Sequence, residues 1–135
     1  MKVLIIEDKP THYDLMQKGI KELGEEYEIV EIDIDIIIKM IKNKDFSKLP
    51  GDIDLFIVDV CLEKDDELGL LFVDNLIRSK YRKGKFKFIV SSVWDRDEFE
   101  TELDIKDNQF INKNDFDGFE LTLELRNKVF KLCGK

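Results

Sequence analysis

Residues 54–61 read DLFIVDVC, and the organisation of the whole chain can be worked out from this stretch. Leu55–Val58 is a continuous apolar run, which is typical of a strand buried on both faces of a parallel sheet. The run ends at one carboxylate, Asp59. Open α/β sheets carry their chemistry at the carboxyl ends of their strands, so Asp59 is a candidate functional residue. The alternative is that this side chain only caps the following loop.

The same patterns along the chain predict four more strands and five helices. Short apolar or alternating runs predict strands at 2–6, 27–32, 86–90 and 108–111. Helical spacing of apolar residues predicts helices at 10–23, 34–42, 70–81, 95–103 and 116–132. The helix at 95–103 is the weakest, because only Phe99 and Leu103 form an apolar pair. Strands and helices alternate, which indicates one α/β domain over residues 1–135 with a parallel sheet and right-handed crossovers.

The charge balance excludes some classes of partner. The chain has 30 acidic and 22 basic residues, and its net charge is −8. Nucleic-acid binding needs a basic face, so it is disfavoured. Cations and basic patches on partner proteins are attracted instead. No apolar stretch approaches the length of a membrane span, so no membrane association is expected.

Cysteine and histidine are scarce. Cys61 follows the buried strand and Cys133 lies near the C-terminus, which is not the pattern of a disulfide framework. The apolar run Val3–Ile6 is cut short by two acids and does not suit a secretory segment. We therefore expect a cytoplasmic protein with both thiols reduced. His12, the single histidine, has no cysteine or second histidine beside it and is expected at the surface.

Polar side chains follow several of the predicted strands at the point where each strand ends. Glu7 and Asp8 follow the first strand, Asp59 ends the third, Ser91 follows the fourth and Lys113 follows the fifth. Parallel strands place these ends at one edge of the sheet. Clustered carboxylates repel one another unless a cation lies among them, and oxygen ligands suit a hard divalent ion such as Mg²⁺. A lysine and a hydroxyl can hold phosphate oxygens, and a carboxylate can itself accept a phosphoryl group.

Four short motifs, each ending a different predicted strand, carry a resemblance to a known family. They are VLIIEDKP at 3–10, DLFIVD at 54–59, FIVSS at 88–92 and FINK at 110–113. Each motif alone is weak, but the four occur in the right order. Over nearly its whole length the chain resembles a response-regulator receiver domain of two-component signalling. The resemblance implies a flavodoxin-like, doubly wound, five-stranded parallel sheet, (βα)5, with strand order 2-1-3-4-5.

The resemblance also implies a role for each acidic residue at this edge. Asp59 matches the aspartate that is phosphorylated. Asp8 would coordinate Mg²⁺ directly together with Asp59, and Glu7 would bind the ion through water. Cys61 would contribute its backbone carbonyl to the metal, so its thiol need not take part.

The remaining site residues are assigned by the same resemblance. Ser91 and Lys113 would bind the phosphoryl oxygens. Ser92 matches a position at which the family keeps a small residue, so that the phosphoryl group can reach the acceptor. Phe110 matches the aromatic side chain that turns inward on activation, and Ser91 with Phe110 would form the switch.

The chain departs from the family pattern at three positions. Glu63 stands where the family has a proline four residues after the acceptor. Gly69 follows Asp59 by ten residues, where the family has a glycine about eight residues on, so the loop at 62–68 is longer and acidic. The family has Lys-Pro with a cis bond where this chain has Lys113–Asn114, and we predict a trans bond because cis without proline costs about 3–4 kcal/mol.

These residues favour a stand-alone phosphoacceptor switch. The phosphoryl group would come from a histidine kinase or a phosphotransfer protein, and the only chemistry would be phosphorylation and dephosphorylation of Asp59 itself. Two alternatives stay open. One is a receiver-like adaptor that binds partners without phosphorylation. The other is a small phosphatase-like α/β enzyme, although residues 7–11, EDKPT, lack the second aspartate of a DxDxT phosphatase motif.

The last predicted helix has more apolar surface than docking on a sheet requires. One stripe is formed by Leu121, Leu125, Val129 and Leu132, and a second by Phe116, Phe119, Leu123 and Phe130. Together they cover more than the roughly 100° of circumference that a core-facing helix buries. We therefore predict that part of the second stripe is exposed and that the last two helices contact a downstream effector or form a self-dimer.

Overall fold

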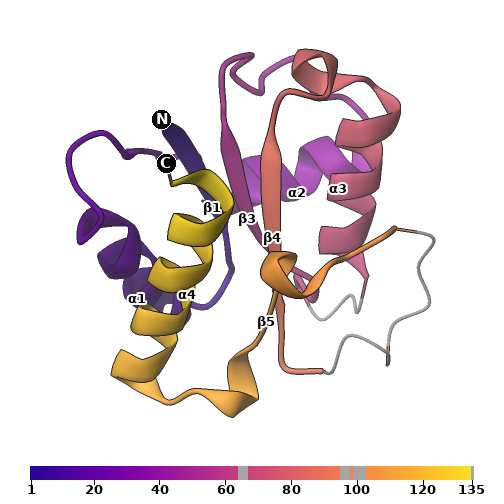
Figure 1. Ribbon diagram of the computed structural model, residues 1–135. Helices are drawn as coiled ribbons and strands as arrows, with labels where there is room; N and C mark the ends of the chain where they lie inside the picture. The colour runs from indigo at the N-terminus through magenta and orange to yellow at the C-terminus, as the bar shows by residue number, and fades with distance from the viewer. Residues whose placement is uncertain (64–66, 95–97, 99–102, 135) are drawn as a thin grey trace.

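Five parallel strands form the central sheet, and their spatial order is β2-β1-β3-β4-β5 (Figure 1). The computed structural model describes residues 1–63, 67–94, 98 and 103–134. The strands are β1 (Lys2–Ile6), β2 (Glu28–Val30), β3 (Leu55–Asp59), β4 (Lys87–Ser92) and β5 (Phe110–Asn112). This arrangement confirms the predicted flavodoxin-like α/β fold and its strand order.

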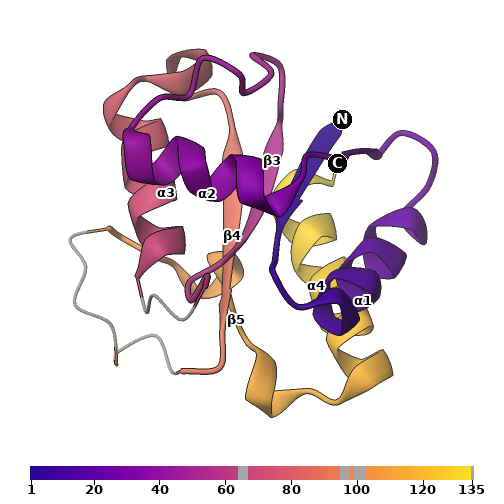
Figure 2. The same ribbon diagram turned by 180° about the vertical axis from the view of Figure 1, so that it is seen from behind.

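Helices cover both faces of the sheet. In the described part of the chain these are α1 (Pro10–Lys21), α2 (Ile34–Asn43), α3 (Leu68–Arg78) and α4 (Gly118–Cys133). Helices α1 and α4 lie on one face, and α2 and α3 lie on the other (Figures 1 and 2). None of the helices in the described ranges is long and apolar enough to cross a bilayer. The helix predicted at 95–103 falls almost entirely outside the described residues.

The apolar side chains of the strands belong to two hydrophobic cores, one on each face of the sheet, because alternate side chains of a strand point to opposite faces. In β3, Phe56 and Val58 pack with α2 and α3, whereas Leu55 and Ile57 pack with α1 and α4. All four side chains are fully buried. Burial of each such side chain contributes about 1.5–3 kcal/mol. The central strand is therefore held from both sides, and its terminal Asp59 is firmly placed.

Helix α3 ends earlier than its apolar spacing predicts. The prediction was 70–81, but the helix ends at Arg78 and Lys80 adopts a left-handed conformation. Tyr81 then opens the short 3-10 helix η1 (Tyr81–Gly84). Its hydroxyl donates to the carbonyl of Pro50 and accepts from the N–H of Ile53 at 3.1 Å. These two distant contacts, together with packing of the ring in the core, draw Tyr81 out of the helical path.

Gly69 brings the first turn of α3 against the backbone of Asp59. Its N–H donates to the carbonyl of Val60 at 2.9 Å. A Cβ atom on this residue would lie 1.9 Å from the Asp59 carbonyl oxygen and 2.9 Å from the Val60 Cα. Only glycine permits this approach. The longer loop between β3 and α3 therefore still delivers a glycine to the strand end, ten residues after Asp59.

We predict that Gly69→Ala lowers the free energy of unfolding by about 2 kcal/mol, because the added methyl group overlaps backbone that cannot move freely. Urea denaturation measures the change. Gly51→Ala is the matched control, since its Cβ would meet no atom within 4 Å, and it should change stability by less than about 0.5 kcal/mol. Equal stability of Gly69→Ala and the wild type would contradict this packing.

Candidate functional site

Three strands bring a lysine and two carboxylates together at the carboxyl edge of the sheet. Glu7 follows β1, Asp59 ends β3 and Lys113 follows β5. The Lys113 Nζ atom lies 2.8 Å from Glu7 Oε1 and 3.2 Å from Asp59 Oδ2. The three side chains are 2%, 0% and 4% exposed for Lys113, Glu7 and Asp59. Lys113 is therefore not a surface lysine but the counter-ion of two buried acids.

This group has more negative than positive charge. Asp8 adds a third carboxylate, and one oxygen from each of Glu7, Asp8 and Asp59 lies within 4.8 Å of the others. Asp8 is more exposed than either of the other two acids. Buried charges are costly unless they are paired, and one ammonium group cannot neutralise three carboxylates. The edge is therefore suited to receive a further cation.

Some of the polar atoms at this edge lack hydrogen-bond partners among the described residues. They are Glu7 Oε2, Asp8 Oδ1 and Ser91 Oγ, and all three atoms are buried. Buried polar atoms are nearly always paired with protein or with bound water. Carboxylate oxygens are the ligands that a hard divalent ion takes. The donor set at this edge thus fits a metal ion, and the serine hydroxyl remains available to a second ligand.

Burial raises the pKa of Asp59 to about 8, and the neighbouring Glu7 carboxylate adds to the rise, while Lys113 opposes it. Ionised Asp59 is thus disfavoured as long as only Lys113 balances the acids. A divalent cation at the edge would favour the ionised form. The protonation of Asp59 and the binding of a cation at this edge are therefore electrostatically linked.

The loop after β3 folds over the acids. The N–H of Glu63 donates to Asp8 Oδ2 at 3.2 Å, and the N–H of Cys61 makes a long contact of 3.4 Å with Asp59 Oδ1. These contacts hold two of the three carboxylates in place. The predicted role of the Cys61 carbonyl as a metal ligand stays a prediction.

The hydroxyl residues at the end of β4 differ in their surroundings. Ser91 lies opposite Asp59 in the register of β3 and β4, and it is fully buried. Ser92 is also buried, but its Oγ accepts a hydrogen bond from the N–H of Trp94 at 2.9 Å. Phe110 is half-buried and packs against the core beneath α2 and α3. The geometry thus places Ser91 beside Asp59, whereas the switch role of Phe110 stays a prediction.

His12 does not behave as the sequence suggested. It was expected at the surface without a partner, but its Nδ1 lies 3.2 Å from Glu7 Oε1 and its side chain is only 27% exposed. Burial and the nearby Lys113 lower the pKa of His12, which favours the neutral imidazole. The first turn of α1 lies over the end of β1 and brings His12 back to Glu7. No sequence motif marks this contact, because it depends on the path of α1 over the end of β1.

The site is open to solvent on the side of α1. A hollow beside the acids is lined by Glu7 and Asp8, by Tyr13 and Asp14 of α1, and by residues 31–34. Ligands can therefore reach Glu7 and Asp8 without a rearrangement of the sheet.

The turn after Lys113 is closed by Asn114 instead of by a proline. All peptide bonds of the described residues are trans, which confirms the trans bond predicted for Lys113–Asn114. The side-chain amide of Asn114 donates to the Val93 carbonyl at 2.8 Å. The backbone N–H of Asn114 donates to Asn112 Oδ1 at 2.9 Å. These bonds tie the segment that carries Lys113 to the end of β4.

Comparisons of the chain with protein-family models, with curated proteins and with solved structures found no match.

We predict that Asp59→Asn stabilises the protein at about pH 8. In the unfolded chain Asp59 ionises near its ordinary pKa of 3.8, whereas in the folded protein the pKa is raised to about 8. Stability contributed by the protonated carboxyl is therefore present near pH 4 and is lost as the pH rises toward 8. Asparagine resembles the protonated form and avoids this loss. A tenfold change in an acid constant is worth about 1.4 kcal/mol, so we expect a gain of at least about that size.

Chemical denaturation at a series of pH values, with a chelator present, measures this effect. The stability difference between Asp59→Asn and the wild type should shrink toward pH 4. Asp115→Asn, at an exposed carboxylate, is the control and should follow the wild type. A variant that is no more stable than the wild type at about pH 8 would contradict the raised pKa.

Proposed function

We propose that the protein is a phosphoacceptor signalling switch of the receiver type. In this proposal Asp59 accepts a phosphoryl group from a phosphohistidine donor, which is a histidine kinase or a phosphotransfer protein, in a Mg²⁺-dependent reaction. The observation that supports it most is the buried edge at which Asp59 and Glu7 share Lys113. At the same edge three buried atoms, Ser91 Oγ, Glu7 Oε2 and Asp8 Oδ1, have no hydrogen-bond partner among the described residues.

The metal would be held by Asp8 and Asp59 and by the Cys61 carbonyl, with Glu7 bound through water. Bound Mg²⁺ supplies positive charge for the oxygens of the transferring phosphoryl group. The orphaned oxygens of Glu7 and Asp8 and the excess of negative charge support this assignment.

In the transfer step an ionised oxygen of Asp59 attacks phosphorus. The new O–P bond forms while the N–P bond of the donor breaks, and its electron pair returns to the histidine nitrogen. Lys113, already 3.2 Å from Asp59 Oδ2, lies where its ammonium group can bind a phosphoryl oxygen. Ser91 can donate its hydroxyl hydrogen to another such oxygen, since its Oγ has no partner among the described residues. Lys113 and Ser91 would have to move to bind these oxygens. Their movement would displace the ends of β5 and β4, and with them Phe110.

We predict that the protein gains about 80 Da, the mass of one phosphoryl group, when it is incubated with Mg²⁺ and acetyl phosphate. Intact-mass spectrometry measures the gain. Asp59→Asn and an excess of chelator should each abolish it, whereas Asp115→Asn should not. If the wild type gains no mass, the phosphoacceptor function fails; if Asp59→Asn still gains mass, the assignment of the acceptor fails.

The signal would leave the protein through α4. Phe119 and Phe130 are 60% and 58% exposed, whereas Leu121, Leu125 and Val129 are buried, which confirms that part of the second apolar stripe is uncovered. The two phenylalanines are eleven residues apart, about three helical turns, and so lie on one side of the helix. We propose that this side contacts a downstream effector or a second copy of the chain.

Phe119→Glu and Phe130→Glu, made singly, should leave the stability within about 0.5 kcal/mol of the wild type, because both side chains are largely exposed. Each should weaken association measured by sedimentation before and after phosphorylation. Leu125→Glu is the control for a buried position and should unfold the protein. Unfolding of both phenylalanine variants would contradict the proposed surface. If the wild type self-associates, equal self-association of the two variants would contradict it as well.

A further inference from the structure

Residues 78–87, RSKYRKGKFK, include six basic residues and no acid, although the whole chain has a net charge of −8. The segment covers the end of α3, the helix η1 and the start of β4. It lies at the amino-terminal end of β4, so the length of that strand separates it from the acidic edge at Asp59 (Figure 1). A basic segment therefore lies at the end of the strands opposite the acidic edge, where Asp52 and Asp54 are paired with Lys2 and Arg82.

Half of these basic residues are already engaged. Arg78 pairs with Asp74, Arg82 pairs with Asp54, and the Lys87 ammonium group donates to the Leu132 carbonyl. The other three are Lys80, Lys83 and Lys85, which we call the basic turn. All three are exposed, and none forms an ion pair with a carboxylate of the described residues.

The backbone of the basic turn is held in an unfavourable conformation. Lys80, Arg82 and Lys83 have φ values of 57°, 47° and 57°, in the left-handed region. Each such residue costs about 1–2 kcal/mol, and conformations of this kind persist only where the surroundings enforce them. The N–H of Lys83 donates to the Lys80 carbonyl at 2.8 Å, and the N–H of Lys85 donates to the Arg82 carbonyl at 3.0 Å. The turn is thus a defined structure and not a loose charged loop.

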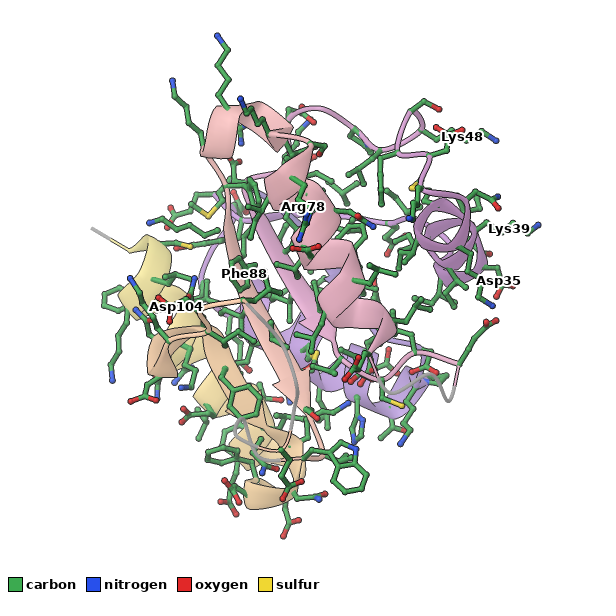
Figure 3. All side chains as sticks on the ribbon, turned by 90° about the vertical axis from the view of Figure 1, so that its right-hand side faces the viewer. Asp35, Lys39, Lys48, Arg78, Phe88 and Asp104 are labelled. Atoms are coloured by element: carbon green, nitrogen blue, oxygen red, sulfur yellow. The ribbon has the colours of Figure 1, made fainter. Side chains whose placement is uncertain are left out.

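Contacts with the core enforce this conformation. The Tyr81 ring packs edge-on against Phe56 and Phe86, with ring centroids 5.5 and 5.6 Å away. Its hydroxyl is bonded to the loop at 50–53, and the Arg82 guanidinium donates to the Ile53 carbonyl at 3.2 Å. In Figure 3 nitrogen-tipped side chains extend into solvent from the turn above α3, whereas Arg78 lies against the helix. The three lysines are therefore presented outward from a rigid base.

We propose that the basic turn is a docking site for a short acidic segment of a partner protein. Three ammonium groups on a rigid turn match a small group of carboxylates at little further cost in backbone entropy. This proposal does not depend on phosphorylation of Asp59.

The surroundings of the turn disfavour the other polyanions. Tyr81 and Phe86 are partly buried against the core, which leaves little aromatic surface for stacking of nucleotide bases, and beside the turn only Ile77 is a large exposed apolar side chain among the described residues, a small anchor for a membrane. A nucleic acid or an anionic bilayer also extends well beyond the turn, where the net charge of the protein repels it. A short acidic segment can cover the three lysines alone.

A fluorescent peptide of about ten glutamates serves as the probe, and anisotropy at about 50 mM salt measures its binding. The wild type should bind it, and the affinity should fall as salt is added. The triple variant Lys80→Glu, Lys83→Glu, Lys85→Glu should bind at least about tenfold more weakly.

The matched control makes the same change of charge at exposed lysines on three other helices: Lys21→Glu, Lys39→Glu and Lys131→Glu. It should bind within about twofold of the wild type, because its lysines lie outside the turn. If the charge-reversal variant is less stable by thermal melting, the corresponding triple change to Gln replaces it. Both variants should still accept a phosphoryl group from acetyl phosphate if Asp59 is the acceptor, so that the two proposals fail separately.

Three results would overturn the proposal. The first is the absence of peptide binding by the wild type. The second is equal weakening in the basic-turn variant and the control, which would show that only net charge matters. The third is tighter binding, through the same lysines, of phosphatidylserine vesicles or of single-stranded DNA than of the peptide, which would assign the turn to a different class of partner.

Discussion

The contact of one lysine with two buried carboxylates is the constraint on which the site depends. Lys113 reaches Glu7 and Asp59 from the end of β5, and these acids end or follow β1 and β3. The contact therefore links three strands of the sheet at one point. Loss of one partner of a buried ion pair leaves an uncompensated charge and typically costs 3–5 kcal/mol, about a third or more of the stability of many domains. The carboxyl edge of the sheet thus holds three strands together through Lys113, and it also carries buried polar atoms without hydrogen-bond partners among the described residues.

The two ends of the strands carry unpaired groups of opposite charge among the described residues. At the carboxyl edge three acids outnumber one lysine, and buried oxygens lack described partners. At the other edge three lysines on a strained turn are without counter-ions in the described part of the chain. The length of the strands separates these two groups of charges (Figure 1). Helix α4, on which Phe119 and Phe130 are exposed, supplies a third surface, and this one is apolar.

Sequence patterns predicted the strands and the residues at the acidic edge, because each strand and the polar residue at its end belong to one short local motif. The strand order came from the family resemblance that these motifs carry. The exposure of Phe119 and Phe130 could also be predicted, since α4 has more apolar surface than one sheet face can cover. Contacts that depend on how the elements pack together were not predictable. Tyr81 continues the apolar spacing of α3, yet its hydroxyl bonds with Pro50, thirty-one residues away, and the helix ends sooner. His12 has no motif of its own, and only the path of α1 over the strand end brings it to Glu7.

The central claim is that Asp59 becomes an acyl phosphate, a mixed anhydride of its carboxyl group with phosphate, and the modified residue can be identified directly. Borohydride reduces such an acyl phosphate to an alcohol, so a phosphorylated aspartate becomes homoserine. The wild type is treated with acetyl phosphate and Mg²⁺, reduced, digested and sequenced by tandem mass spectrometry. The account predicts homoserine at position 59 and at no other position. Homoserine at another aspartate, or none at all, would contradict it.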